Sequence, residues 1–475
     1  MLLGVVPVLC VGAIASDSGK PRVIVLTDIG NEPDDAESLV RFLLYSNDLQ
    51  VEGLIATTST WQRTRVRTDL VEERVRAYGK VLPNLRIHAP GYPDMERLLS
   101  VIKAGRAEYG MSGVGVGKET DASKLIIAAA DRLDARPVWL TLWGGSVDLA
   151  QALWSVRETR SPQALAHFVA RLRVYAISDQ DDAASWIRAN FPTLFWVGST
   201  HSFGSYRLAT WIGISAPLPG ADQMVVSKDW LEANIRKGAL GTLYPLPMFI
   251  MEGDTPSFLY LLPNGLGSPD QPGWGSWGGR YGRVGPSLGL YGDTMDAVLG
   301  VDGRSYSGNQ ATVWRWRREF QNDFAARVAW STTSDLHAVN HSPHVVVNGE
   351  DGLEAIELAT CANKPVKLSA AGTSDPDGDT LQYRWWQYLE ASEELNPQAL
   401  VIHDAGAAEA SVVAPPVRKP SLNVELPPES RYHVILSVTD AGQPALTRYR
   451  RVILKVPAEG TPASSVLGCA GAGGV

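Results

Sequence analysis

Cysteine is scarce in this sequence of 475 residues, which contains only Cys10, Cys361 and Cys469. A disulfide-rich scaffold is therefore not expected. A zinc centre is not indicated either, because no pair of cysteines or histidines has the short spacing that zinc ligands usually show. If Cys10 is removed with an N-terminal leader, one disulfide between Cys361 and Cys469 is compatible with the sequence but not required by it.

Long apolar runs and basic blocks are also missing. No stretch reaches the ~18 apolar residues of a transmembrane helix, so a membrane span is not expected. The 43 Lys and Arg are outnumbered by 51 Asp and Glu, which gives a net charge of −8. A nucleic-acid partner is not expected, because binding to phosphates requires clustered positive charge. The length predicts about two or three globular domains.

The first 20 residues, MLLGVVPVLCVGAIASDSGK, are mostly apolar up to Ala15. They end in a small-x-small pattern, Ala13-Ile14-Ala15, which is typical of a signal-peptide cleavage site. The segment before the apolar run lacks the usual Lys or Arg. We therefore interpret residues 1–20 as a signal peptide or another apolar leader, and we expect a secreted or extracytoplasmic protein.

Residues 21–333 alternate between short apolar runs and amphipathic segments. RVIVLT precedes DDAESLVRFLLYS, and RLRVYAIS precedes DDAASWIRANF. This alternation predicts an α/β domain with a mostly parallel sheet flanked by helices. Ligands of such sheets bind beyond the carboxyl ends of the strands, where Asp28, Trp143-Gly144-Gly145 and Ser178-Asp179 are expected.

The composition changes after Thr333. Residues 334–345 form a polar linker, and residues 346–457 contain alternating apolar patterns interrupted by DPDGD and DAGQP turns. These features predict an all-β sandwich that resembles immunoglobulin-like modules of the polycystic-kidney-disease or cadherin type. The three acids of DPDGD, namely Asp375, Asp377 and Asp379, either bind Ca²⁺ or form a tight turn. Residues 458–475 are expected to be a disordered tail.

The stretch VIVLTDIGNEPDD places three carboxylates behind a buried strand. Asp28 follows the strand, and Asp34 and Asp35 begin a helix, where the dipole favours anions. Taken singly, Asp28 is explained as a turn former and Asp34 as an N-cap. Together on one edge of the sheet they favour an oxygen-liganded cation such as Ca²⁺, because unpaired like charges repel.

Several motifs resemble those of nucleoside N-ribohydrolases: VIVLTDIGNEPDDAESL, VEGLIATTST, LTLWGGSVDLAQAL and MEGDTPSFLYLL. A closer resemblance is carried by ISDQDDAASWIRANFP, EGDTPSFLYLLPNGL and WGSWGGRYG. These segments are similar to a family of cellulose-binding proteins with a nucleoside-hydrolase-like N-terminal domain and an Ig-like C-terminal domain. The resemblance covers roughly residues 21 to 457.

The resemblance implies a role for each acid. Asp28 corresponds to a calcium ligand that also acts as the general base for the attacking water. Asp35 and Asp254 correspond to further calcium ligands, and a backbone carbonyl at about Gly144 completes the set. Asp34 corresponds to an acid that hydrogen-bonds sugar hydroxyls.

The sequence also departs from the nucleoside hydrolases. Two residues are inserted between Asp28 and Asp34, Trp61 stands near the ribose-binding asparagine, and Gly253 replaces a histidine that helps to protonate the leaving base. These departures make release of a nucleobase less expected than cleavage of another glycosidic bond. Glu252 or Asp179 could instead protonate an alcohol leaving group, a task for a carboxyl of raised pKa.

Five more residues are candidates for carbohydrate binding, and each has a structural alternative. Gln180 could bind hydroxyls, whereas a lone His201 after a strand is more often structural. Trp274, Trp277 and Tyr281 lie in a Gly-rich loop, where aromatic rings stack on sugars or simply fill a core. Asp181 and Asp182 could cap a helix.

These observations predict a secreted hydrolase that cleaves a glycosidic bond in a carbohydrate by metal-activated water. The first alternative is a non-catalytic cellulose- or polysaccharide-binding protein, and the second is a nucleoside N-ribohydrolase. An oligo- or polysaccharide partner is expected in the first two cases. The sugar, the linkage and the oligomeric state stay open.

Overall fold

The computed structural model describes residues 19–201, 203–392, 398–416 and 429–457. Most of the expected leader, the expected tail and Cys469 lie outside these ranges. Cys361 is disulfide-bonded. None of the described helices is long and apolar enough to cross a bilayer.

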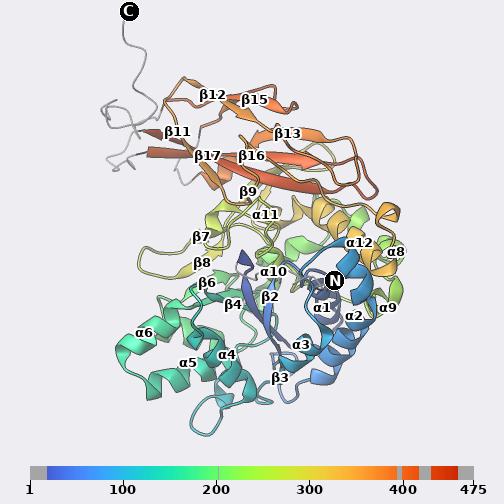
Figure 1. The fold of residues 1–475 in the computed structure, drawn as a ribbon. Coiled ribbons are helices and arrows are strands. Elements are labelled where there is room, and N and C mark those ends of the chain that lie inside the picture. The colour runs from blue at the N-terminus through green and yellow to red at the C-terminus, as the bar shows by residue number, and fades with distance from the viewer. Residues whose placement is uncertain (1–18, 202, 393–397, 417–428, 458–475) are drawn as a thin grey trace, which may run out of the picture.

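The α/β domain is built on a mostly parallel sheet (Figure 1), which confirms the predicted fold class. Its strand order is β3-β2-β1-β4-β5-β6-β8-β7, and β7 alone pairs antiparallel. The strands are β1 (Arg22–Thr27), β2 (Gln50–Ala56), β3 (Ile102–Ala104), β4 (Val138–Leu142), β5 (Leu172–Ala176), β6 (Phe195–Gly198), β7 (Tyr281–Arg283) and β8 (Leu290–Asp293).

Helices cover both faces of this sheet (Figure 1). They are α1 (Asp34–Leu44), α2 (Thr68–His88), α3 (Met95–Ser100), α4 (Asp121–Asp131), α5 (Val147–Thr159), α6 (Pro162–Ala170), α7 (Asp182–Asn190), α8 (Lys228–Asn234), α9 (Gly238–Gly241), α10 (Pro256–Leu259), α11 (Ala311–Trp314) and α12 (Arg317–Thr332). A hairpin of β9 (Asp296–Leu299) and β10 (Ser305–Gly308) precedes α11.

Strand β1 is buried on both faces, as expected for the centre of a parallel sheet. Val23 and Val25 pack with residues of α1 and α2, whereas Ile24 and Leu26 face α4 and α5. Because β1 pairs with β2 on one side and β4 on the other, the strand order reverses at β1. Ligands of open α/β sheets bind at such a reversal, so the fold directs attention to the carboxyl ends of β1 and β4.

The C-terminal domain is a two-sheet sandwich with an apolar core between the sheets. Its strands are β11 (Ile356–Ala359), β12 (Pro365–Ser369), β13 (Gln382–Gln387), β14 (Val401–His403), β15 (Glu409–Val413), β16 (Glu429–Thr439) and β17 (Thr447–Pro457). One sheet has the order β11-β17-β16-β13 and the other β12-β15-β14. The predicted all-β sandwich is therefore present.

The two domains share a continuous core. Tyr388 and Tyr449 of the sandwich belong to the same buried cluster as Trp316 of the α/β domain. The Trp316 ring lies 5.7 Å from that of Tyr449 and 6.1 Å from that of Tyr388. The sandwich is thus packed as part of the body of the protein.

This interface corrects the sequence interpretation of Trp274 and Trp277. Trp277 is 1% exposed, and its indole N–H donates to the Tyr449 hydroxyl over 3.3 Å. The Trp274 ring packs against His433 at 5.4 Å, and the Trp274 carbonyl oxygen accepts a hydrogen bond from Arg451 Nη2. The Trp277 ring fills space between the domains and is not accessible to a sugar, and the half-buried Trp274 packs at the same interface.

Candidate functional site

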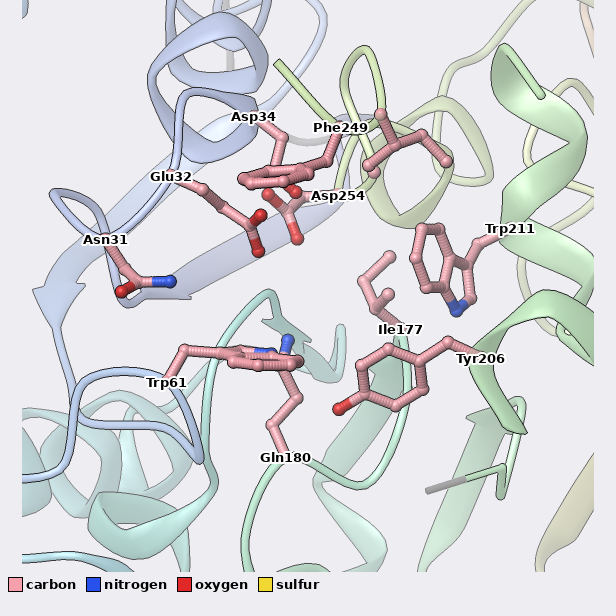
Figure 2. Close-up of a pocket in the computed structure, with 12 residues that line it drawn as sticks. Asn31, Glu32, Asp34, Trp61, Ile177, Gln180, Tyr206, Trp211, Phe249 and Asp254 are labelled. Atoms are coloured by element: carbon pink, nitrogen blue, oxygen red, sulfur yellow. The ribbon is translucent and has the colours of Figure 1, made fainter. Parts of the chain in front are cut away.

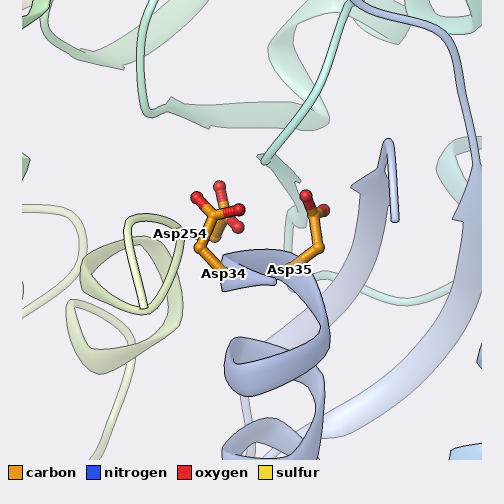
Figure 3. A group of neighbouring side chains, drawn as sticks. All are labelled: Asp34, Asp35 and Asp254. Atoms are coloured by element: carbon orange, nitrogen blue, oxygen red, sulfur yellow. The ribbon is translucent and has the colours of Figure 1, made fainter. Parts of the chain in front are cut away.

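Three carboxylates converge at the start of α1 (Figure 3). Asp34 and Asp35 are the first two residues of the helix, and Asp254 lies just before α10. Each offers one oxygen, and these oxygens lie within 4.8 Å of one another. Pro33 is the N-cap of α1 and no side chain caps the helix, so Asp34 does not have the capping role that was its structural alternative.

Asp28 lies beside this trio at the end of β1. It is 4% exposed and within hydrogen-bonding reach of Asp35 and Ser59. A Cβ at Gly144 would lie 2.8 Å from Asp28 Oδ1, so only glycine allows the end of β4 to approach so closely. Asp28 is thus a neighbour of both Asp35 and Gly144. The oxygens that lie within 4.8 Å of one another, however, belong to Asp34, Asp35 and Asp254, whereas the sequence prediction had Asp28 in place of Asp34.

The electrostatics of the cluster favour binding of a positive charge. Burial and, secondarily, neighbouring acids raise the pKa values of Asp34, Asp35 and Asp254 well above the usual range. Burial also raises the pKa of Asp28 to about 6. Asp34 Oδ1 and Asp254 Oδ2 are buried without a hydrogen-bond partner. Among the residues that the structure describes, no Lys or Arg forms an ion pair with these four acids. A divalent cation with oxygen ligands fits such a site.

A pocket of about 510 Å³ opens above the carboxylates (Figure 2). Trp61 and Tyr206 lie across the pocket from Asp34 and Asp254. The lining residues are Asn31, Glu32, Asp34, Trp61, Ile177, Gln180, Tyr206, Trp211, Phe249, Ile250, Gly253 and Asp254. Four of these residues, Asp34, Trp61, Gln180 and Asp254, are candidates from the sequence. Carboxylates at one side and aromatic rings around them suit a ligand with hydroxyls and an apolar ring face.

Two aromatic residues of the pocket are held by specific contacts. The Trp211 indole N–H donates to Ser178 Oγ over 2.9 Å, and its ring meets Tyr206 edge-on at 5.9 Å. Both belong to short helices, η3 (Phe203–Leu208) and η4 (Thr210–Ile214), that follow β6. Phe249 differs, since it is 78% exposed.

Gln180 connects the pocket to two strand ends. Its side-chain amide donates to the Trp143 backbone carbonyl. The backbone carbonyl of Gln180 accepts a hydrogen bond from the Thr60 N–H over 2.7 Å. The neighbouring Trp61 is 41% exposed. Gln180 therefore fixes the loop that carries the Trp61 ring.

Glu252 does not lie in the pocket, contrary to its predicted role as a proton donor. It is 0% exposed and pairs with Arg41 Nε at 2.8 Å. Tyr244 and Thr255 also donate to its carboxylate, each over 2.8 Å. Glu252 therefore stabilises the loop that carries Asp254, and its buried carboxylate is not accessible to a substrate in the pocket.

Asp179 and His201 are also engaged elsewhere. Both carboxylate oxygens of Asp179 accept from Arg188, at 2.7 and 2.6 Å, so the predicted acid is a paired structural group. His201 Nε2 lies 3.1 Å from Asp293 Oδ2. Neither residue lines the pocket. Asp181 caps α7 through the Ala183 and Ala184 N–H groups, which is the structural alternative considered for it.

Glu32 is the pocket acid that the sequence analysis did not single out. It lies in the inserted segment before α1, and Figure 2 shows its carboxylate beside Asp254. Burial raises its pKa. In the sequence, its position near the two aspartates in NEPDD could have indicated that it belongs to the acid cluster. Tyr206, Trp211 and Phe249 had no motif, because their segment has no regular periodicity.

Glu37 is a further buried acid beneath the site. Its Oε2 accepts the Glu252 N–H over 2.8 Å, whereas its Oε1 is buried without a partner. Burial raises the pKa of Glu37 to about 9, which favours the protonated form of this carboxyl.

Comparisons with known proteins agree with this architecture. Residues 22–281 match a family described as "Cellulose-binding Sde182, nucleoside hydrolase-like domain". Residues 365–456 match "Cellulose-binding protein Sde0182, C-terminal domain". No curated protein matches the chain.

One similar solved structure is a nucleoside hydrolase-related hypothetical protein from Saccharophagus degradans that is associated with carbohydrate metabolism. It is 36% identical, its TM-score is 0.77, and the match covers 92% of this chain and 100% of that chain. The solution structure of a PKD domain matches 23% of this chain and 84% of its own at 20% identity, with a TM-score of only 0.16. The chain belongs to the family of cellulose-binding proteins with a nucleoside-hydrolase-like domain.

Proposed function

We propose that this protein is a secreted hydrolase that cleaves a glycosidic bond in an oligo- or polysaccharide. The observation that carries the proposal is a cluster of buried, unneutralised carboxylates beneath a pocket with aromatic walls. The solved relative associated with carbohydrate metabolism and the cellulose-binding family support a carbohydrate substrate.

Asp34, Asp35 and Asp254 would hold a cation, and we propose Ca²⁺ with Asp28 beside it. The partnerless oxygens of Asp34 and Asp254 suit a hard cation, because hard cations take carboxylate oxygens as ligands. When bound, such an ion offsets the negative charge and lowers the pKa of water at the site.

The side chains divide the remaining work. Asp28 is not itself a lining residue of the pocket but lies next to Asp34, which is. With a pKa that burial raises to about 6, Asp28 would accept the proton of a water held at the carboxylate cluster near neutral pH. The water oxygen forms the new bond to the anomeric carbon as the bond to the leaving oxygen breaks. Glu32 delivers a proton to the leaving oxygen of the glycosidic bond. It suits this role because burial raises its pKa and its carboxyl group faces the pocket. Trp61 and Tyr206 hold the sugar ring.

Reducing-sugar release from cellulose-derived and mixed oligosaccharides tests the proposal. Asp28→Asn and Asp254→Asn should each abolish release, and a chelator should do the same to the unaltered protein. Asp179→Asn is the matched control, because this acid pairs with Arg188 outside the pocket. Full turnover by Asp28→Asn would contradict the proposal.

The alternative is a carbohydrate-binding protein without turnover. The departures at Trp61 and Gly253 and the exposed Phe249 favour it. In that case insoluble polysaccharide should retain the protein, Trp61→Ala should weaken retention, and Asp28→Asn should have no effect.

Nucleoside hydrolysis is disfavoured by the packing around Gly253. A Cβ there would lie 2.9 Å from Asp34 Oδ2 and 3.0 Å from Trp211 Cζ3, so the position has no room for a histidine. Release of free base from inosine or uridine would establish this alternative.

A further inference from the structure

A second group of acids lies in the C-terminal sandwich, in the DPDGD turn between β12 and β13. Asp375, Asp377 and Asp379 each offer one oxygen within 4.8 Å of the others. Asp375 Oδ1 accepts the N–H groups of Asp377 and Asp379, at 2.9 and 3.1 Å. These bonds explain the shape of the turn but leave the other oxygen of Asp375, Oδ2, buried without a partner.

Asp440, just beyond β16, points to a ligand independently of that turn. It is 2% exposed. Its Oδ1 accepts from Asn340 Nδ2, Gly442 N and Leu446 N at 3.0, 3.1 and 2.9 Å. Its Oδ2 is buried and has no partner. The Asp375 charge acts on Asp440, so the two carboxylates with bare oxygens are electrostatic neighbours.

Asn340 adds a neutral oxygen from the segment before the sandwich. It is 6% exposed, and its Nδ2 donates to Asp440 Oδ1 and to the Pro444 carbonyl, the latter over 2.9 Å. These two acceptors fix the orientation of the amide. Its Oδ1 is therefore turned away from them and is buried without a partner. Asn340 lines a cavity of about 320 Å³ together with Asp377 and Asp379.

Gly442 explains how the amide reaches this position. A Cβ at Gly442 would lie 2.2 Å from Asn340 Cγ, Nδ2 and Oδ1. Only a glycine lets the amide of Asn340 lie flat against the DAGQP turn. The turn is thus shaped around this side chain.

Among the described residues, no lysine or arginine compensates these acids. Within the described ranges, the ion pair of this cluster is that of Asp377 with His341, at 2.9 Å, and no Lys or Arg pairs with Asp375, Asp379 or Asp440. Buried carboxylate and amide oxygens without donors are costly unless a cation binds them. Ca²⁺ takes six to eight such oxygens in flexible geometry.

We propose that Asn340, Asp375, Asp379 and Asp440, with Asp377 at the edge, form a Ca²⁺ site in the C-terminal domain. The site joins three segments: the linker, the DPDGD turn and the end of β16. It is separate from the pocket and does not depend on the proposed hydrolysis.

His341 connects the proposed Ca²⁺ site to the α/β domain. Its backbone N–H donates to Asp377 Oδ2 over 2.6 Å, and its ring lies 3.0 Å from His88 Nδ1 at the end of α2. The ring also stacks on Trp330 of α12 at 5.3 Å. An ion at this site therefore fixes the linker against both domains.

Calcium stoichiometry of the full chain tests the proposal. The pocket is first silenced with Asp34→Asn and Asp254→Asn, and equilibrium dialysis then measures Ca²⁺ per chain. We expect one bound ion, and adding Asp440→Asn should weaken its affinity at least tenfold. The control is Asp404→Asn, an exposed acid of the same domain. Binding of no Ca²⁺ by the pocket-silenced protein would overturn the proposal, as would unchanged affinity in Asp440→Asn.

Because Asp440 is buried, its replacement could impair folding, so two further variants keep the test decisive. Asp379→Asn removes a partly exposed carboxylate, and Gly442→Ala displaces Asn340 without changing any charge. In the pocket-silenced protein, Ca²⁺ should raise Tm by several degrees, and each variant should lose this shift. An unaltered shift in both variants would contradict the site. Absence of glycosidase activity would not affect this readout.

Discussion

Aspartates are buried both in the pocket and at the domain interface. Those at the interface are paired with arginines, whereas those in the pocket are not, among the residues that the structure describes. Asp323 of α12 pairs with Arg327 at 3.0 Å and with Arg448 of the sandwich at 2.7 Å. Burial alone would raise the Asp323 pKa, yet the two arginines outweigh it and hold the pKa below the usual range. Asp254 has burial without such partners, and its pKa rises.

Asp296 repeats the interface pattern. It pairs with Arg280 and Arg315, each at 2.7 Å, and accepts from the Tyr388 hydroxyl at 2.6 Å. Burial again opposes ionisation, and again the arginines keep the pKa low. Acids that the fold needs are neutralised within the fold. In the described part of the chain, the aspartates with a buried oxygen that lacks a partner cluster in the pocket and around the DPDGD turn, so we expect cations at these two places.

The largest effect is expected from breaking a paired acid. Asp323→Asn leaves Arg327 and Arg448 buried without their carboxylate and should lower the free energy of unfolding by about 3–5 kcal/mol. Urea unfolding in chelator measures this change. Loss of less than about 1 kcal/mol would show that the interface pair is not required.

Removing a bare acid should have the opposite sign in chelator. Asp254→Asn relieves repulsion with Asp34 and Asp35, so the free energy of unfolding should rise by about 1–2 kcal/mol without Ca²⁺. With Ca²⁺ present the variant should lose the stabilisation that the unaltered protein gains. A destabilised variant in chelator would contradict the assignment of Asp254 as unneutralised.

The pH dependence of stability should also separate the two regions. Asp28 has a raised pKa of about 6, so between about pH 4 and 6 the folded state binds more protons than the unfolded state. Stability in chelator should therefore fall as pH rises through this window. Asp323 has a lowered pKa, so its contribution is present above the unfolded pKa and is lost as pH falls toward the folded pKa.

Thermal scans from pH 3 to 8 measure both trends. Asp28→Asn should flatten the decline between pH 4 and 6, and Asp323→Asn should flatten the loss at acidic pH. Saturating Ca²⁺ should remove the decline at the pocket, because the ion binds the deprotonated carboxylates. Asp34, Asp35 and Asp254 also have raised pKa values, so part of the decline should remain. A decline of unchanged steepness in Asp28→Asn would argue against a contribution from this acid.

The smallest effect on stability is expected at Trp61. Because its ring is 41% exposed, Trp61→Ala should change the free energy of unfolding by no more than about 0.5 kcal/mol. Its affinity for oligosaccharide should nevertheless fall at least tenfold in a binding titration. Arg63→Ala, an exposed change in the same loop, is the control.

The fold could be predicted from the sequence because its signals are local. Strand–helix alternation predicted the parallel sheet, and the turn from β1 into α1 brings Asp28 close to Asp34 and Asp35. Asp254 is far along the chain, and only the family resemblance indicated that it would join them. The pairing of β1 with both β2 and β4 explains why that edge is the site.

The wrong assignments involve partners that local sequence does not reveal. Glu252 was expected to face the substrate, but Arg41, more than 200 positions earlier, pairs with it below the pocket. Asp179 forms an ion pair with Arg188 of the following helix, α7. Trp277 is buried at the domain interface, where it donates a hydrogen bond to Tyr449 of the sandwich. The sequence of the Gly-rich loop does not indicate this contact.

The absence of a side chain at position 253 constrains how this protein can change. Asp34 and Trp211 occupy the space that any larger residue would need. A Gly253→His exchange alone would push on both the acid cluster and the pocket wall, so gain of nucleobase-directed activity requires at least a paired change at Trp211. For an enzyme engineer, positions 211 and 253 are therefore best varied together, since the size tolerated at one depends on the ring at the other.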